Sequence, residues 1–180
     1  MNQSAKHNTL SLITAALFTA VTAVCSQISI PMPTEVPLTL QTFAVALCGY
    51  VLGAKWGLAS ITAYILLGAA GVPVFAGFKG GIQSLFAASG GFIYGFILFT
   101  LFCGLSLFVS GKPLKICLGF AGLALCHLTG IIHFSAVYKT GFIPAFLTVS
   151  MPYLIKDAVS VILAFFISLC IRKRTGRIIS

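Results

Sequence analysis

Long apolar stretches, each about as long as a helix that crosses a bilayer, follow one another along almost the whole chain. A membrane-spanning helix takes roughly 20 predominantly apolar residues, and glycine, proline and charged residues separate six such stretches here. We predict spans at residues 9–28, 40–52, 55–70, 91–110, 115–134 and 145–171. The second stretch is short, so its helix either begins earlier or is tilted, and in both cases Gln41 lies near membrane depth.

The shortage of charged side chains excludes most other classes of protein. The 180 residues include 11 basic and 2 acidic ones, and 59% of the chain is apolar, whereas about a quarter of the residues in a soluble domain are charged. Such a chain cannot cover a water-facing surface, which excludes a soluble enzyme, a secreted disulfide scaffold and a nucleic-acid binder. We expect one all-α integral membrane domain over residues 1–180, a bundle of six transmembrane helices with long, partly re-entrant outer loops.

The positions of the basic residues predict the orientation of the bundle in the cell membrane. Cytoplasmic loops carry an excess of lysine and arginine. An arrangement with both termini in the cytoplasm places eight of the eleven basic residues inside, and leaves Lys79, Lys139 and Lys156 outside. The eight are Lys6, Lys55, Lys112, Lys115, Arg172, Lys173, Arg174 and Arg177.

The connections predicted on the outer side are longer than those inside. They cover residues 29–39, 71–90 and 135–144, and they are rich in proline and glycine yet apolar, as in the segment 72–78. Non-helical backbone at membrane depth cannot face lipid, because its N–H and C=O groups would have no partner. We therefore expect the segment around Phe75 and Lys79 to fold back over the bundle as a lid, or to line a cavity.

Asp157 is the strongest single candidate for a functional residue. It is one of two acids in the chain and lies in an apolar stretch, where an ionisable side chain costs several kcal/mol unless it faces a polar or wet interior. The alternatives are a pair with Lys156 or a position near the solvated interface. The other acid, Glu35, lies between prolines in the first outer loop, where solvent can reach it.

A polar cluster at the start of the second span is a second candidate. Thr39, Gln41 and Thr42 could hydrogen-bond a ligand, although Thr39 could equally cap the helix. Tyr64 and Tyr153 are within reach of the same outer side, and a position in the interfacial belt of tyrosines is the alternative for each.

Neither the cysteines nor the histidines are spaced as metal ligands. The six cysteines are scattered through the spans, and the histidines at positions 127 and 133 point to different faces of one helix. We expect no metal, no cofactor and no catalytic site, because the chain lacks a nucleophile–base pair. The first span carries small residues at helical spacing, Ala16 and Ala20, which would let another helix approach closely, either within the bundle or from another subunit.

Several motifs, in order along nearly the whole chain, resemble those of the biotin transporter family BioY. They are the segments 37–42, 66–77, 80–81 and 89–92, and Pro152-Tyr153 with Asp157 four residues further on. The resemblance implies six helices with a vitamin pocket at the outer face. It also implies that the chain binds biotin for an energy-coupling factor transporter, with a transmembrane coupling protein and two ATPases as partners and with Ala16 and Ala20 as the docking surface.

The chain departs from the family pattern in the last helix. The family usually carries Asp-x-x-Lys there, a pair that would hold the ureido ring of biotin, whereas this chain has Asp157 and Ser160. Ser160 can donate one neutral hydrogen bond, and Lys79 or Lys156 could supply the missing cation. The departure leaves another small vitamin or precursor as an alternative ligand. An intramembrane lipid-modifying enzyme and an assembly subunit are alternatives of other classes.

Overall fold

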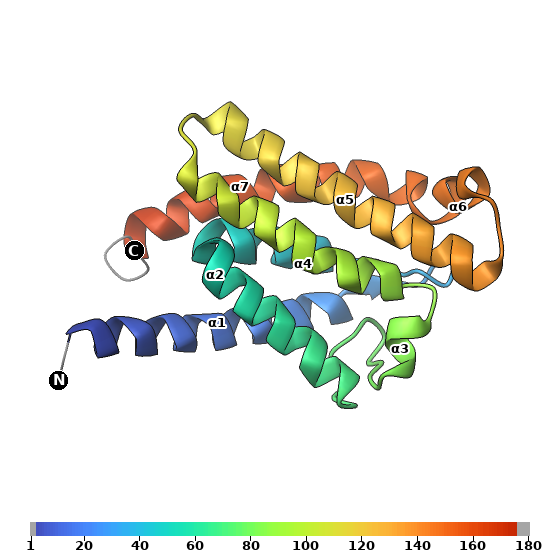
Figure 1. Ribbon diagram of the computed structural model, residues 1–180, viewed down its shortest axis with the longest axis horizontal. Coiled ribbons are helices and arrows are strands. Elements are labelled where there is room, and N and C mark those ends of the chain that lie inside the picture. Colours follow the sequence, from blue (N-terminus) through green and yellow to red (C-terminus); the bar gives the residue numbers. More distant parts are fainter. Residues whose placement is uncertain (1–2, 176–180) are drawn as a thin grey trace.

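Apolar stretches with few charged residues build the long helices of the bundle. The computed structural model describes residues 3–175, and Figure 1 shows the long helices running along one axis. The elements are α1 (Gln3–Gln27), β1 (Ser29–Ile30), β2 (Leu38–Thr39), α2 (Gln41–Ala69), α3 (Gln83–Phe86), α4 (Gly90–Leu105), η1 (Ser106–Phe108), α5 (Lys112–Tyr138), α6 (Phe142–Val149), η2 (Met151–Tyr153) and α7 (Leu154–Thr175). Within these described residues, five helical stretches are long and apolar enough to cross a membrane.

The longest helix, α2, is broken in its middle by a glycine. Gly53 has φ 76° and ψ −178°, which is not helical, and a positive φ of this kind is one that glycine adopts at little cost. The chain turns there, so that α2 consists of two arms that run in different directions (Figure 1). The break lies where the sequence predicts the boundary between the second and third spans.

Two predicted boundaries are wrong. The outer connection predicted at residues 135–144 is mostly helical, because α5 continues to Tyr138 and α6 begins at Phe142. Pro144 fits in the first turn of α6, where a backbone N–H has no helical acceptor. The span predicted at residues 145–171 is interrupted between α6 and α7, at Ser150 and the short helix η2 that contains Pro152.

The two ends of the bundle differ, and we call them the closed end and the cavity end. The closed end holds the connection between α4 and α5, the beginning of α1 and the end of α7 (Figure 1). Gly53 lies there too, because a Cβ added to it would be 3.0 Å from the Leu107 side chain of η1. The cavity end holds α3, α6 and the β1–β2 hairpin, in which Ser29 pairs with Thr39. Arg177, one of the predicted cytoplasmic residues, lies outside the described residues.

At the closed end, α2 and α4 meet almost backbone to backbone. A Cβ atom added to Gly49 would lie 2.6 Å from the Thr100 carbonyl oxygen, and one added to Gly104 would lie 2.4 Å from the Ala54 nitrogen. Arg172 of α7 donates to the Val51 carbonyl oxygen over 2.9 Å, next to the break in α2. These contacts leave no space for a ligand between α2 and α4 at this end.

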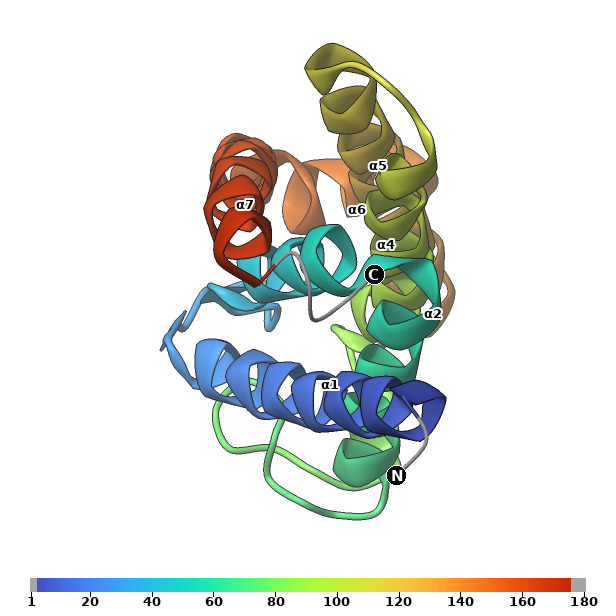
Figure 2. The same ribbon diagram turned by 90° about the vertical axis from the view of Figure 1, so that its left-hand side faces the viewer.

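Helix α1 packs on α2 with one of its faces. Ala15 and Phe18 are buried there, and the Thr19 hydroxyl lies 3.0 Å from the Ser60 carbonyl oxygen. Viewed along the bundle, α1 lies on the far side of α2 from α5 and α7 (Figure 2). Its opposite face, which includes Ala16 and Ala20, is exposed.

Candidate functional site

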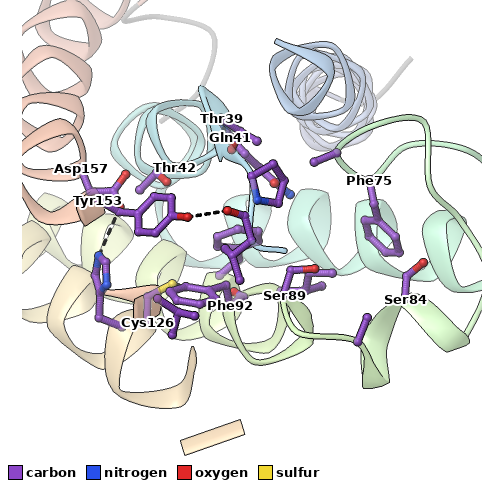
Figure 3. Close-up of a pocket in the computed structure, with 18 of the residues that line it drawn as sticks. Thr39, Gln41, Thr42, Phe75, Ser84, Ser89, Phe92, Cys126, Tyr153 and Asp157 are labelled. Carbon is purple, nitrogen blue, oxygen red and sulfur yellow. Dashed lines mark hydrogen bonds and ion pairs between the residues drawn. The ribbon is translucent and has the colours of Figure 1, made fainter. Parts of the chain in front are cut away.

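A cavity lies between the helices at the cavity end of the bundle. It spans about 800 Å³, including the open space at its mouth. Asp157 and Tyr153 stand at one side of it and Phe75 and Ser84 at the other, with Phe92 between them (Figure 3). The residues that line the cavity are Val36, Pro37, Thr39, Gln41, Thr42, Phe75, Ala76, Lys79, Ser84, Ala87, Ser89, Phe92, Ile93, Phe96, Leu123, Cys126, His127, Val149, Tyr153, Lys156 and Asp157.

Asp157 lies within a chain of polar contacts between three helical segments. Its Oδ2 lies 3.2 Å from His127 Nε2 of α5, and 7% of each of these two side chains is exposed. His127 Nδ1 lies 2.8 Å from the hydroxyl of Ser150, which follows α6. A carboxylate removed from water needs partners of this kind, so α5 and the α6–α7 junction together hold Asp157 in place.

Lys156 supplies the opposite charge. Its ammonium forms an ion pair with Asp157 Oδ1, and it also donates to the Thr39 carbonyl oxygen over 2.8 Å and to the Thr42 hydroxyl over 3.3 Å. The alternative that Asp157 pairs with Lys156 is thus correct. The pair does not remove Asp157 from the candidate site, because both residues line the cavity.

Tyr64 connects the polar cluster of α2 to the lid. The Gln41 amide donates to the Tyr64 hydroxyl over 2.7 Å, and that hydroxyl donates to the Val74 carbonyl oxygen over 3.0 Å. The Tyr64 ring packs edge-on against Phe75, with 5.5 Å between the ring centroids. The Thr39 hydroxyl oxygen accepts from the backbone N–H of Gln41 over 3.2 Å, so Thr39 satisfies a backbone group at the start of α2 and also lines the cavity.

The lid, residues 71–90, contains a tight turn at residues 75–79, and the Phe75 side chain is buried against the helices. Phe75 and Lys79 form an antiparallel bridge with two backbone hydrogen bonds. Gln27 at the end of α1 donates to the Phe75 carbonyl oxygen over 3.1 Å and accepts from the Phe78 N–H over 2.8 Å. Phe75 is 3% exposed although its segment is not helical. As predicted, residues of the apolar segment line a cavity.

Tyr153 holds the first outer loop against the start of α7. Its hydroxyl donates to the Val36 carbonyl oxygen and lies 2.8 Å from the Thr34 hydroxyl. At 4% exposure, Tyr153 is buried and does not lie in an exposed belt.

The structure brings together six of the eight residues predicted to bind the substrate. Thr39, Gln41, Phe75, Lys79, Tyr153 and Asp157 line the cavity, whereas Ser160 and Tyr64 are not among its lining residues. The Ser160 hydroxyl donates instead to the Lys156 carbonyl oxygen over 2.9 Å. Tyr64 lies behind Gln41 and Phe75 and supports them.

His127 is the residue that the sequence analysis missed. Its spacing from His133 argues against a shared metal site on one helix, and the sequence offers no other reason to select it. Its partners lie in other segments of the fold, on α7 and between α6 and η2. The sequence does contain one signal for this pair. A histidine and an aspartate lie in separate apolar spans, and each needs a polar partner when it is buried.

Residues 1–177 match the sequence model of the BioY family. The chain belongs to the BioY family. It is 38% identical over 166 residues to the biotin transporter BioY of Thermotoga maritima, a match that covers 90% of this chain and 95% of the relative. It is 40% identical over 153 residues to the probable biotin transporter BioY of Pyrococcus horikoshii, which covers 85% of this chain and 90% of that one.

The fold of this BioY protein also matches a solved structure. That structure is the crystal structure of the S-component for biotin from an ECF-type ABC transporter, with a TM-score of 0.85 over 96% of this chain and 95% of the other. At 23% sequence identity the likeness concerns the fold. Together with the apolar helices, it makes the chain a multi-pass membrane protein.

Proposed function

We propose that this chain is the substrate-binding component for biotin of an energy-coupling factor transporter, and that it takes up biotin without catalysing a reaction. The observation that carries the proposal is the ion pair between the buried Asp157 and the partly buried Lys156, at one side of a cavity with largely apolar walls. Biotin likewise has a polar end and an apolar part. Its ureido ring carries N–H donors and a C=O acceptor, and its thiophane ring and aliphatic tail are apolar. Membership of this transporter family argues against an intramembrane enzyme.

Asp157 accepts a ureido N–H in this proposal. An ionised carboxylate has about four acceptor positions, and His127 and Lys156 occupy two of them. The remaining capacity allows a charge-assisted hydrogen bond, which is stronger than a neutral one. His127 and Ser150 act as positioning residues that fix the direction of the carboxylate.

Lys156 takes the place of the lysine that the family usually has at position 160. An ammonium has three N–H donors, and in this structure Lys156 donates to the Thr39 carbonyl oxygen and to the Thr42 hydroxyl while it forms an ion pair with Asp157. The Thr42 contact is the longest at 3.3 Å, so the ureido C=O can replace it while the other two contacts stay. Ser160 then has no direct role in binding and stabilises the local helix.

Lys79 binds the carboxylate of the aliphatic tail. It lines the cavity from the lid, and among the described residues it forms no ion pair. Phe75 and Tyr153 pack against the apolar part of the ligand, and Gln41 and Thr39 offer further polar contacts to it.

The chain forms one membrane domain over residues 1–180 with six spans, counting each arm of α2 as one. The beginning of α1 and the end of α7 lie at the same end of the bundle, which fits an even number of spans. The basic residues Lys55, Lys112 and Arg172 are also at that closed end, so it faces the cytoplasm of the cell and the cavity faces outward. The lid, residues 71–90, dips back into the bundle from outside.

A transmembrane coupling protein and two ATPases supply the energy for uptake. The exposed face of α1, with Ala16 and Ala20, is the docking surface for the coupling protein, because small residues let two helices approach closely. The opposite face of α1 is already used against α2.

Titration calorimetry of the purified chain against a panel of vitamins tests the proposal. We expect biotin to bind more tightly than thiamine, riboflavin or folate. Heat with one of the other vitamins and none with biotin would assign the same architecture to a different ligand.

A further inference from the structure

A second cavity adjoins the first on the side of the outer loops. It encloses about 760 Å³ including its opening. Five residues line both cavities: Pro37, Ala76, Lys79, Ala87 and Ser89. The two spaces therefore share a wall made by the first outer loop, the lid and the segment before α4. We call the second cavity the outer chamber.

The outer chamber contains one of the two acids of the chain. Glu35 lines it and is exposed, whereas Asp157, the other acid, lines the first cavity. The Glu35 carboxylate accepts a hydrogen bond from the Tyr138 hydroxyl. No lysine or arginine among the described residues forms an ion pair with Glu35, although Lys79 lines the same chamber.

The proposed pose of biotin directs its tail toward this chamber. Asp157 and Lys156 hold the ureido ring in the first cavity, and Lys79, which lies on the shared wall, binds the tail carboxylate. When that carboxylate is converted to an amide, the atoms added beyond the carbonyl continue into the outer chamber. An ammonium at the end of such a tail meets Glu35.

We propose that the site accepts amides of biotin whose amine part ends in an ammonium group, with the outer chamber holding the added tail and Glu35 pairing with its charge. This inference rests on the proposed biotin-binding function. The lysine amide of biotin belongs to this chemical class. The charge pair contributes modestly, because Glu35 is exposed and water screens an exposed ion pair.

Two synthetic amides that differ only in charge provide the test. Biotin N-(5-aminopentyl)amide carries a terminal ammonium, and biotin N-pentylamide does not. Each is titrated into the purified full chain and into Glu35→Gln, which keeps a hydrogen-bond acceptor for Tyr138. We expect both amides to bind the unchanged chain, and the charged amide to bind about two- to fivefold more tightly than the neutral one. Glu35→Gln removes that difference and leaves biotin affinity unchanged.

Failure of this inference is distinguishable from failure of the proposed function. If biotin binds tightly and neither amide does, the outer chamber does not accept a tail and the inference is overturned. A preference for the charged amide that persists in Glu35→Gln overturns the role of Glu35. If biotin itself does not bind, the proposed function fails, and the amide inference fails with it.

Discussion

At the closed end of the bundle α2 and α4 touch through glycines, whereas at the cavity end the helices leave a cavity with polar and charged side chains at one side. Gly49 and Gly104 bring two backbones close together, and neither has a side chain that could bind a ligand. At the other end Asp157 and Lys156 of α7 and His127 of α5 line the cavity and contact one another. The difference shows how one set of helices can be rigid at one end and bind a ligand at the other.

A substitution that forces α2 and α4 apart at the closed end should have the largest effect, a loss of stability. Gly104→Ala places a Cβ 2.4 Å from the Ala54 nitrogen and 2.6 Å from the Gly53 carbonyl carbon, and backbone atoms cannot move aside as a flexible side chain can. Overpacking of this kind lowers the free energy of unfolding by about 1–3 kcal/mol or more. Thermal unfolding in detergent measures the loss.

Gly141→Ala is the matched control for that substitution. The nearest atom to an added Cβ at Gly141 is 3.5 Å away, in Pro144, which is an ordinary contact. The expected change is less than about 1 kcal/mol. Equal unfolding temperatures for the two variants would show that the close approach of α2 and α4 does not stabilise the fold.

Removing the Asp157 carboxylate should abolish most ligand binding but leave the fold intact. Asp157→Ala deletes a charge-assisted hydrogen bond to the ureido N–H, so we expect biotin affinity to fall by about 1.5–3 kcal/mol, or roughly ten- to a hundredfold. Calorimetry measures the affinity. Glu35→Gln, at the other acid of the chain, is the control that keeps full affinity, and normal biotin binding by Asp157→Ala would place the ureido ring elsewhere.

The positive charge at the cavity end can be moved from position 156 to position 160. Lys156→Met should weaken biotin binding by about tenfold, because the ureido C=O loses a charged donor. Adding Ser160→Lys restores the spacing usual in the family, one turn from Asp157 on the same face of α7. We expect the double variant to regain most of the lost affinity, and a double variant that binds no better than Lys156→Met would argue against Lys156 as the replacement.

A bulky substitution on the exposed face of α1 should reduce uptake without changing ligand binding or the stability of the fold. Ala20→Trp adds bulk where a partner helix is expected and touches neither the cavity nor the contact with α2, so coupled biotin uptake should fall severalfold while binding is unchanged. Ala15→Trp, on the buried face, should instead destabilise the fold. If binding and uptake fall together in Ala20→Trp, this face packs within the protein.

The sequence predicted the apolar helices and most of the cavity because both follow from local patterns. A run of apolar residues near the length of a bilayer specifies a helix whatever its neighbours, and a buried acid such as Asp157 must lie near a polar interior. The start of α6 is not evident from the sequence, because Pro144 reads as a loop residue although proline is tolerated in the first turn of a helix. The role of His127 was missed because Asp157 and Ser150 reach it only after three helical segments have packed.

A structure of the chain with biotin bound would show the orientation of the ligand in the cavity. We expect the ureido oxygen within about 3.2 Å of Lys156 Nζ, a ureido nitrogen at the same distance from an Asp157 carboxylate oxygen, and the tail directed toward Lys79. Biotin in the reverse orientation, with its carboxylate against Lys156 and its ureido ring at the lid, would rule out this mode of binding.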